Sequence, residues 1–279
     1  MTEASILGVG ALLLGLCLGS FLNVCIVRMP QDRSVVRPPS HCPGCRSGIA
    51  WYDNLPVLSW LMLRGRCRRC EAPISRVYPL VELLTGILVW LVWRNVVGDD
   101  AVISLGHAAT FVYYTVFVCM LIGLTFIDVR FHIIPDEFSI YAVPIGVLGA
   151  WGVQHAGGSA HITWQYSVIG ALVGGGFLAT IAGVFWLIRR QEGMGMGDIK
   201  LLAMIGSFLG AFPALLVVLI LSSVIGSVVG LVMIATQGRT LRLALPYGPF
   251  LALGALAYLL YGEQLVHWIF LPIARLGAA

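Results

Sequence analysis

Eight long apolar runs occupy most of this sequence and limit what it can fold into. The first, residues 4–27, exceeds the roughly 20 apolar residues that carry a helix across a bilayer. It is also longer than the apolar part of a cleaved signal peptide, about 7–15 residues, so we expect it to be retained. The runs predict helices at 4–27, 79–97, 105–127, 138–153, 166–188, 199–212, 214–236 and 247–262. We therefore expect an all-α polytopic membrane protein with about eight transmembrane helices.

Charged side chains are too few to cover a surface in water. They make up 11% of the 279 residues, against about 25% in a typical soluble domain. Nine of the seventeen basic residues are arginines between Arg28 and Arg76. Such a patch can bind nucleic acid, but Lys and Arg also gather in the cytoplasmic loops of membrane proteins. We favour a cytoplasmic loop, with membrane lipid and no nucleic acid as its partner.

A cytoplasmic loop at 28–78 fixes the orientation of the remaining segments. If successive helices alternate in direction, three further loops fall on the same side. They lie at 128–137 with Arg130, at 189–198 with Arg189 and Arg190, and at 237–246 with Arg239 and Arg242. The loops at 98–104 and 154–165 fall on the opposite side and contain no Lys or Arg. This distribution predicts an N-terminus outside the cytoplasm.

The 28–78 insert carries the clearest metal-ligand pattern in the chain. It is too small to bury a core of its own and needs a staple. Two CxxC pairs, Cys42 with Cys45 and Cys67 with Cys70, are separated by 21 residues. Two such pairs can place four thiolates tetrahedrally around one Zn²⁺, and four protein ligands leave no open position, so we predict a structural zinc. Redox dithiols or disulfides are the alternative, which a reducing cytoplasm disfavours.

Two aspartates stand where apolar runs meet a cytoplasmic loop. Asp128 ends the third run, and Asp198 opens the sixth, directly after Gly195-Met196-Gly197. The predicted topology puts both at the cytoplasmic end of a helix and at similar depth. Two close carboxyl groups in a poorly solvated site share a proton. One can then act as a general base on water while the other donates to the carbonyl under attack, as in an aspartic protease.

Intramembrane acids alone leave other functions open. A proton-coupled transporter also keeps carboxylates in its helices, although it favours broken helices and acids near the midplane. A non-enzymatic assembly factor of a secretion machine could use the same aspartates to hold helices together. Acids at helix ends favour the protease over the transporter.

Several short motifs resemble the type IV prepilin peptidase family, whose members are bifunctional leader peptidases. In chain order they are Gly19-Ser20-Phe21-Leu22-Asn23-Val24 with Arg28 and Pro30, Cys42-Pro43-Gly44-Cys45, Cys67-Arg68-Arg69-Cys70, Ile74-Ser75-Arg76, Tyr78-Pro79-Leu80-Val81-Glu82, Ile127-Asp128 with Ile134-Pro135-Asp136, and Gly195-Met196-Gly197-Asp198 with Lys200. The last of these matches a GxGD motif, and the similarity extends over nearly the whole chain.

The resemblance implies two reactions at the cytoplasmic face of a bacterial inner membrane. The first is cleavage after the glycine that ends the short basic leader of a prepilin or pseudopilin, with Asp128 and Asp198 as the catalytic pair. The residues that resemble the supporting positions of this site are Gly195, Gly197, Lys200 and Asp136. The second reaction is N-methylation of the new N-terminal residue from S-adenosylmethionine.

The methyltransferase part has a weaker basis in the residues themselves. No GxGxxG fingerprint follows a strand in this sequence, so methyl transfer rests on the resemblance. The polar residues near the cysteine loop that could meet the cofactor are Asn23, Arg28, Arg76 and Glu82. For Arg76 and Glu82, mutual pairing or headgroup contact is the alternative. We expect a methyltransferase part at 1–97 and a peptidase part at 98–279.

Overall fold

A computed structural model describes residues 3–98, 103–158, 162–191, 195–237 and 246–276 of the chain. The α-helices are α1 (Glu3–Arg28), α2 (Leu58–Met62), α3 (Val77–Val97), α4 (Leu105–Phe131), α5 (Ala142–His155), α6 (Trp164–Arg189), α7 (Met196–Leu209), α8 (Ala214–Gln237) and α9 (Gly248–Leu276). Three short 3-10 helices are η1 (Met29–Gln31), η2 (Trp51–Asn54) and η3 (Asp136–Phe138). Over the described ranges the β structure consists of two isolated bridges. The all-α prediction is confirmed.

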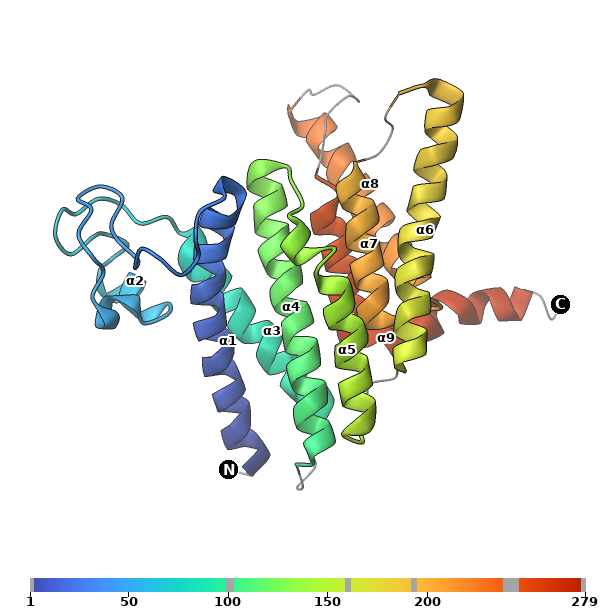
Figure 1. The fold of residues 1–279 in the computed structure, drawn as a ribbon, viewed down its shortest axis with the longest axis horizontal. Coiled ribbons are helices and arrows are strands. Elements are labelled where there is room, and N and C mark those ends of the chain that lie inside the picture. The colour runs from blue at the N-terminus through green and yellow to red at the C-terminus, as the bar shows by residue number, and fades with distance from the viewer. Residues whose placement is uncertain (1–2, 99–102, 159–161, 192–194, 238–245, 277–279) are drawn as a thin grey trace.

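The eight longer helices pack side by side and run alternately in opposite directions, but the C-terminal part of α9 projects away from the bundle (Figure 1). Six of them, α1, α3, α4, α6, α8 and α9, are long and apolar enough to cross a membrane. Helices α5 and α7 have 14 residues each, so each is about 21 Å long, shorter than a hydrocarbon core of about 30 Å. The predicted count of about eight helices therefore holds for the bundle, while six helices meet the length of a full span.

Three helices that end with an arginine in their last turn all end on the same side of the bundle. The C-terminal ends of α1, α4 and α6 lie at the upper end of the bundle in Figure 1. Arg28, Arg130 and Arg189 belong to those ends. Arg239 and Arg242 lie outside the described residues. Arg94 lies in the last turn of α3, at the opposite end.

Several helix boundaries differ from the sequence prediction; for example, α4 ends at Phe131 and not at residue 127. Helix α7 begins at Met196, so Asp198 lies inside its first turn and not before it. Helix α5 begins only at Ala142, because residues 136–138 form the separate turn η3. Helix α9 continues to Leu276 through a kink at Tyr261, where the apolar run was expected to end near 262. The polar Glu263 and His267 interrupt the run after the kink and hide the helix from a hydropathy pattern.

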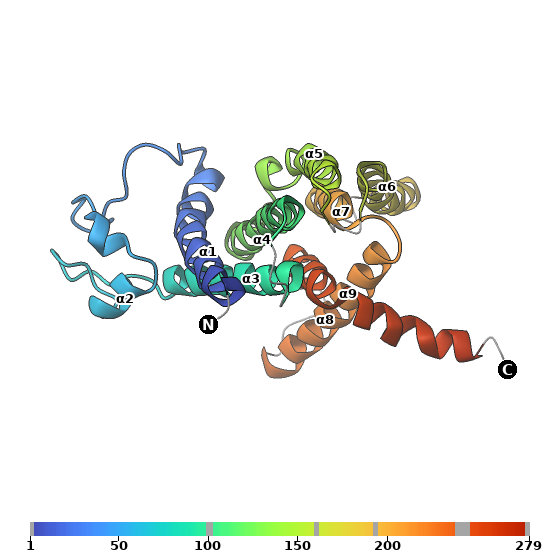
Figure 2. The same cartoon turned by 90° about the horizontal axis from the view of Figure 1, so that it is seen from below.

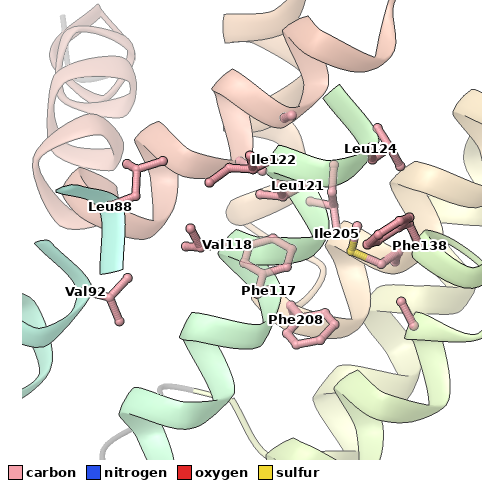
Figure 3. Packing of buried hydrophobic residues seen from close by; sticks show 14 of the residues in the cluster. Leu88, Val92, Phe117, Val118, Leu121, Ile122, Leu124, Phe138, Ile205 and Phe208 are labelled. Atoms are coloured by element: carbon pink, nitrogen blue, oxygen red, sulfur yellow. The ribbon is translucent and has the colours of Figure 1, made fainter. Parts of the chain in front are cut away.

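Helix α4 is the centre of the core. Seen from below, it lies between the α1–α3 pair and the group formed by α5, α6 and α7 (Figure 2). Its Phe117 ring stacks on Phe208 of α7 at 4.7 Å (Figure 3). The Tyr113 ring stacks on Phe208 at 4.9 Å. The Tyr113 hydroxyl also donates to the Ser207 carbonyl at 3.2 Å. Buried aromatic pairs of this kind fix α7 against α4.

Glycines allow the helix pairs to approach closely. A Cβ on Gly170 of α6 would collide with the backbone of Gly206 in α7, and the reverse also holds. A Cβ on Gly15 of α1 would lie 2.8 Å from the Gly86 Cα of α3. Close backbone approach at small residues is how helices pack in lipid, where no hydrophobic force drives them together. These contacts fix the position of α7, which carries Asp198.

Candidate active site

Asp128 lies in the last turn of α4, with its side chain directed into the bundle. His132 caps the helix in a left-handed conformation with φ 57°, and its N–H donates to the Asp128 carbonyl at 2.9 Å. The Asp128 residue is only 6% exposed. Its carboxylate accepts a hydrogen bond from the backbone N–H of Gly248, the first residue of α9. Burying a carboxyl group with a single fixed donor lowers the stability of the fold. A carboxyl group kept in such a place is therefore a candidate for a functional residue.

Asp198 lies in the first turn of α7, where the helix dipole favours an acid. Gly197 has a steric reason to be glycine, because a Cβ there would lie 3.0 Å from the Ile134 side chain. Gly195 has no such reason: its φ is −66° and its Cβ position is uncrowded. The crowded position is therefore Gly197, against the Ile134 side chain, and not Gly195.

The fold brings the two aspartates together across 70 residues of sequence. The end of α4 and the start of α7 lie at the same end of the bundle (Figure 1). The two carboxyl groups are close enough to repel each other electrostatically. Such a pair holds one proton more readily than two negative charges, so it can offer a base and an acid at once.

Two of the predicted supporting residues, Lys200 and Asp136, form an ion pair near Asp198. The Lys200 Nζ of α7 contacts Asp136 Oδ1 of η3 at 2.7 Å. Both side chains are partly exposed, so the ion pair adds little stability by itself. It ties the segment after α4 to the helix that carries Asp198. Lys200 therefore pairs with Asp136 in the structure.

The four loop cysteines lie together away from this site. Each pair forms the same turn: Cys42 N–H donates to Ser47 at 2.9 Å, and Cys67 N–H donates to Ala72 at 2.9 Å. The four sulfur atoms all lie within 4.8 Å of one another, and those of Cys42 and Cys70 are 3.7 Å apart. Tetrahedral Zn–S bonds of about 2.3 Å require sulfur separations of about 3.8 Å. The cluster could hold a metal ion, and its geometry fits zinc.

The four thiols differ in how readily they ionise when no cation is present. Burial and the neighbouring cysteine thiols raise the pKa of Cys70 to about 12, whereas the pKa of Cys45 is lowered. The Ser47 hydroxyl lies 2.9 Å from the Cys45 sulfur and lowers the pKa of that thiol to about 6. A thiol with this pKa is ionised at neutral pH, which is the form that binds metal. Nearby, Arg68 donates to both carboxylate oxygens of Asp53 at 2.6 to 3.0 Å and so joins the second turn to η2.

Glu82 anchors the cysteine loop to the membrane helices. It is 8% exposed on α3, and its carboxylate accepts the Val57 N–H at 2.7 Å. Ser20 and Asn23 of α1 also hydrogen-bond to it, and Asn23 donates a second N–H to the Tyr78 carbonyl at 3.0 Å. Glu82 is thus bonded to α1 and the loop. Arg76 lies exposed at the start of α3.

We expect Glu82→Ala to destabilise the docking of the loop on α1 and α3. The substitution leaves the Val57 N–H and the Asn23 amide without their acceptor, at a cost of about 1–3 kcal/mol for each unsatisfied donor. Thermal unfolding in detergent should shift downwards, and trypsin should cut faster at the loop arginines. Glu137→Ala, at an exposed acid of η3, is the matched control. Equal trypsin sensitivity of the two variants would rule out the anchor.

Arg28 borders a hollow between α1 and the loop. The hollow has a volume of about 300 Å³. Its lining comprises Cys17, Ser20, Phe21, Val24, Arg28, Val35, Val36, Pro38, Pro39, Ser40 and Asn54. The Arg28 Nη1 donates to the Ser34 carbonyl at 3.1 Å, which leaves other guanidinium donors for a ligand.

Comparison with known proteins identifies the family of this chain. Residues 115–231 match the model described as the type IV leader peptidase family, and residues 13–96 match the bacterial peptidase A24 N-terminal domain. A type 4 prepilin-like proteins leader peptide-processing enzyme from Escherichia coli is 36% identical over 87% of this chain and 90% of its own length. The chain belongs to the type IV leader peptidase family.

Two further leader peptidases show how far the similarity extends. A prepilin leader peptidase/N-methyltransferase from Aeromonas hydrophila is 36% identical over 92% of this chain and 91% of its own length. One from Myxococcus xanthus is 41% identical over 70% of this chain, but the match spans only 54% of that relative. No solved structure matches the chain. The predicted family resemblance is confirmed, and these names give the transporter alternative no support.

The sequence analysis missed Gly248 of this candidate site, and it named Ile134 only within a family motif, without a role. Ile134 lies against the start of α7 and also beside Gly248, where its Cδ1 would be 3.5 Å from an added Cβ. Gly248 itself donates to Asp128. The only sequence signal was the turn-forming stretch Pro246-Tyr247-Gly248-Pro249 before the last apolar run. It predicts a turn but gives no hint of the aspartate that it meets.

Proposed function

We propose that this chain removes the leader of prepilin or pseudopilin substrates after a glycine and then methylates the new N-terminal residue. The juxtaposed carboxyl groups of Asp128 and Asp198 are the observation that carries the hydrolytic part. The names of the relatives, which describe prepilin leader peptidases and N-methyltransferases, support both parts.

The aspartate pair can carry hydrolysis without a covalent intermediate. The ionised carboxylate takes a proton from water as the oxygen attacks the scissile carbonyl carbon. The protonated carboxyl group donates to the carbonyl oxygen, which gives a neutral tetrahedral diol. Collapse of the diol breaks the C–N bond, and a proton passes to the leaving amine. We assign neither role to one residue, because the pair titrates as a unit.

The position of the pair suits a substrate that is itself held in the membrane. A substrate anchored by its own transmembrane helix presents its scissile bond at one depth. Confining both partners to the bilayer removes much of the orientational cost of their encounter. The arginines on the same end of the bundle support the cytoplasmic face of a bacterial inner membrane as the location.

The two cofactors would lie in the N-terminal part. Cys42, Cys45, Cys67 and Cys70 would hold a structural zinc, with no open position for chemistry. S-adenosylmethionine supplies the methyl group when it is bound. The hollow beside α1 is a suitable place for it, since Arg28 can pair with a carboxylate and Ser40 and Asn54 add polar groups. Asn23 and Glu82 would hold the loop wall of this hollow in place. We assign Arg76 no contact with the cofactor.

Mass spectrometry of a processed substrate tests the proposal. The purified chain is placed in liposomes with a prepilin-type peptide that carries a short basic leader, a glycine and a transmembrane helix. We expect leader removal after the glycine with or without S-adenosylmethionine. We expect a further gain of about 14 Da, one methyl group, only with the cofactor.

A substrate with a bulky residue in place of that glycine is the control and should stay intact. Absence of cleavage in the matched substrate would overturn the peptidase assignment. Cleavage without the mass gain would remove the methyltransferase part alone.

A further inference from the structure

The start of α9 makes a direct backbone contact with Asp128. The Gly248 N–H donates to the Asp128 carboxylate. The contact is so close that a Cβ on Gly248 would lie 2.5 Å from Asp128 Oδ2. Only glycine therefore lets the peptide backbone reach the carboxylate without displacing it.

Tyr247, the preceding residue, is fixed to α8. Its hydroxyl lies 2.8 Å from the Ser222 Oγ and 3.3 Å from the Ser223 Oγ. Ser222 is fully buried and donates its own proton to the Leu219 carbonyl at 3.1 Å, so the tyrosine hydroxyl donates to Ser222. The Tyr247 carbonyl accepts the Phe250 N–H at 3.0 Å and so begins α9.

These contacts connect α8 to a catalytic carboxylate through two residues. We propose that Tyr247 and Gly248 are positioning residues for Asp128: the partly buried tyrosine holds the start of α9, and the glycine N–H fixes one carboxylate oxygen so that the other faces Asp198. A hydrogen bond to an ionised group is stronger than one between neutral groups, so a single N–H can hold the rotamer. The inference rests on the proposed hydrolytic function of Asp128.

The arrangement should act on the chemical step more than on substrate binding. A donor that is already aligned removes the need to reorganise the site during the reaction. In the proposed function, the substrate is anchored in the bilayer by its own transmembrane helix and not by Asp128. Loss of the contact should therefore lower kcat and leave KM nearly unchanged.

Gly248→Ala is the direct test, with cleavage of the prepilin-type peptide followed in liposomes at several substrate concentrations. The backbone N–H remains, but the added Cβ displaces the Asp128 carboxylate from it. We expect kcat to fall by about a hundredfold, comparable to the loss of one preorganised hydrogen bond, with KM within about threefold. Gly176→Ala in α6, where an added Cβ meets nothing within 4 Å, is the matched control and should keep the wild-type kcat.

Tyr247→Phe keeps the ring and removes only the hydroxyl, so it tests the anchor in a protein that folds. We expect kcat to fall about tenfold, the effect of one lost hydrogen bond. Tyr261→Phe, at an exposed tyrosine of α9, is the control and should leave kcat unchanged. Methylation of a substrate that already lacks its leader reports whether each variant is intact.

The outcomes separate this inference from the proposed function. If wild type does not cleave, the proposed function fails. If wild type cleaves but Gly248→Ala retains kcat within threefold of it, the positioning role alone is wrong. If Gly248→Ala fails to fold, Tyr247→Phe decides: a wild-type kcat, or a change in KM without one in kcat, overturns the inference.

Discussion

Asp128→Asn and Asp198→Asn should each lower leader cleavage by about a thousandfold, within the range of general acid–base catalysis. Asparagine keeps the volume of the side chain but cannot take a proton from water or share one with its partner. Because the two carboxyl groups act as one unit, the double variant should be no worse than either single one. Mass spectrometry of the prepilin-type peptide in liposomes measures all three.

Glu137→Gln is the matched control for these variants. Glu137 is an exposed acid of η3 near the same end of the bundle, and its loss should leave cleavage within about twofold, since exposed surface substitutions have small effects. Methylation of a substrate without its leader should persist in both aspartate variants. Normal cleavage by either Asn variant would mean that the aspartates only hold helices together, as in the assembly-factor alternative.

The positions of the two aspartates and the four cysteines could be predicted from short sequence patterns and the alternation of the helices. Asp128 stands at the end of an apolar run, and the topology alone puts Asp198 at the same end of the bundle. The CxxC spacing is likewise a property of two short turns, which the structure forms at Cys42 and Cys67 in the same way. Patterns of this kind require no knowledge of which helices touch.

The rest of the site depends on contacts between distant segments. Gly248 meets Asp128 only because α8 and α9 pack beside α4, and no period in the sequence reports that contact. Glu82 was a candidate for cofactor binding because it is a polar residue beside a helix end near the cysteine loop, and polar groups at this depth are often functional. Its partners, among them the Val57 N–H, belong to a loop whose path is fixed only when the fold is complete. Sequence patterns thus located the ionisable groups and missed the backbone donors that orient them.

Removal of the loop metal should unfold residues 29–76, the segment between α1 and α3, and separate the two activities. Structural zinc contributes an apparent binding free energy of about 10–16 kcal/mol, which a loop without its own core cannot replace. Cys42→Ser and Cys67→Ser should each lose bound zinc and become sensitive to trypsin at the loop arginines. Methylation should fall to background, because one wall of the hollow beside α1 consists of loop residues such as Val36 and Pro39.

Leader cleavage should survive in the same variants within about tenfold, since Asp128, Asp198 and Gly248 lie on helices outside the loop that carries the four cluster cysteines. Cys119→Ala, at a cysteine of α4 outside the cluster, is the control for the loss of a thiol. Metal analysis, trypsin digestion and the two product masses are read from one preparation. A trypsin-resistant, zinc-free loop would show that the metal is no staple. Simultaneous loss of cleavage and methylation from an intact bundle would show that the loop also serves the aspartates, against the division into two parts near residue 97.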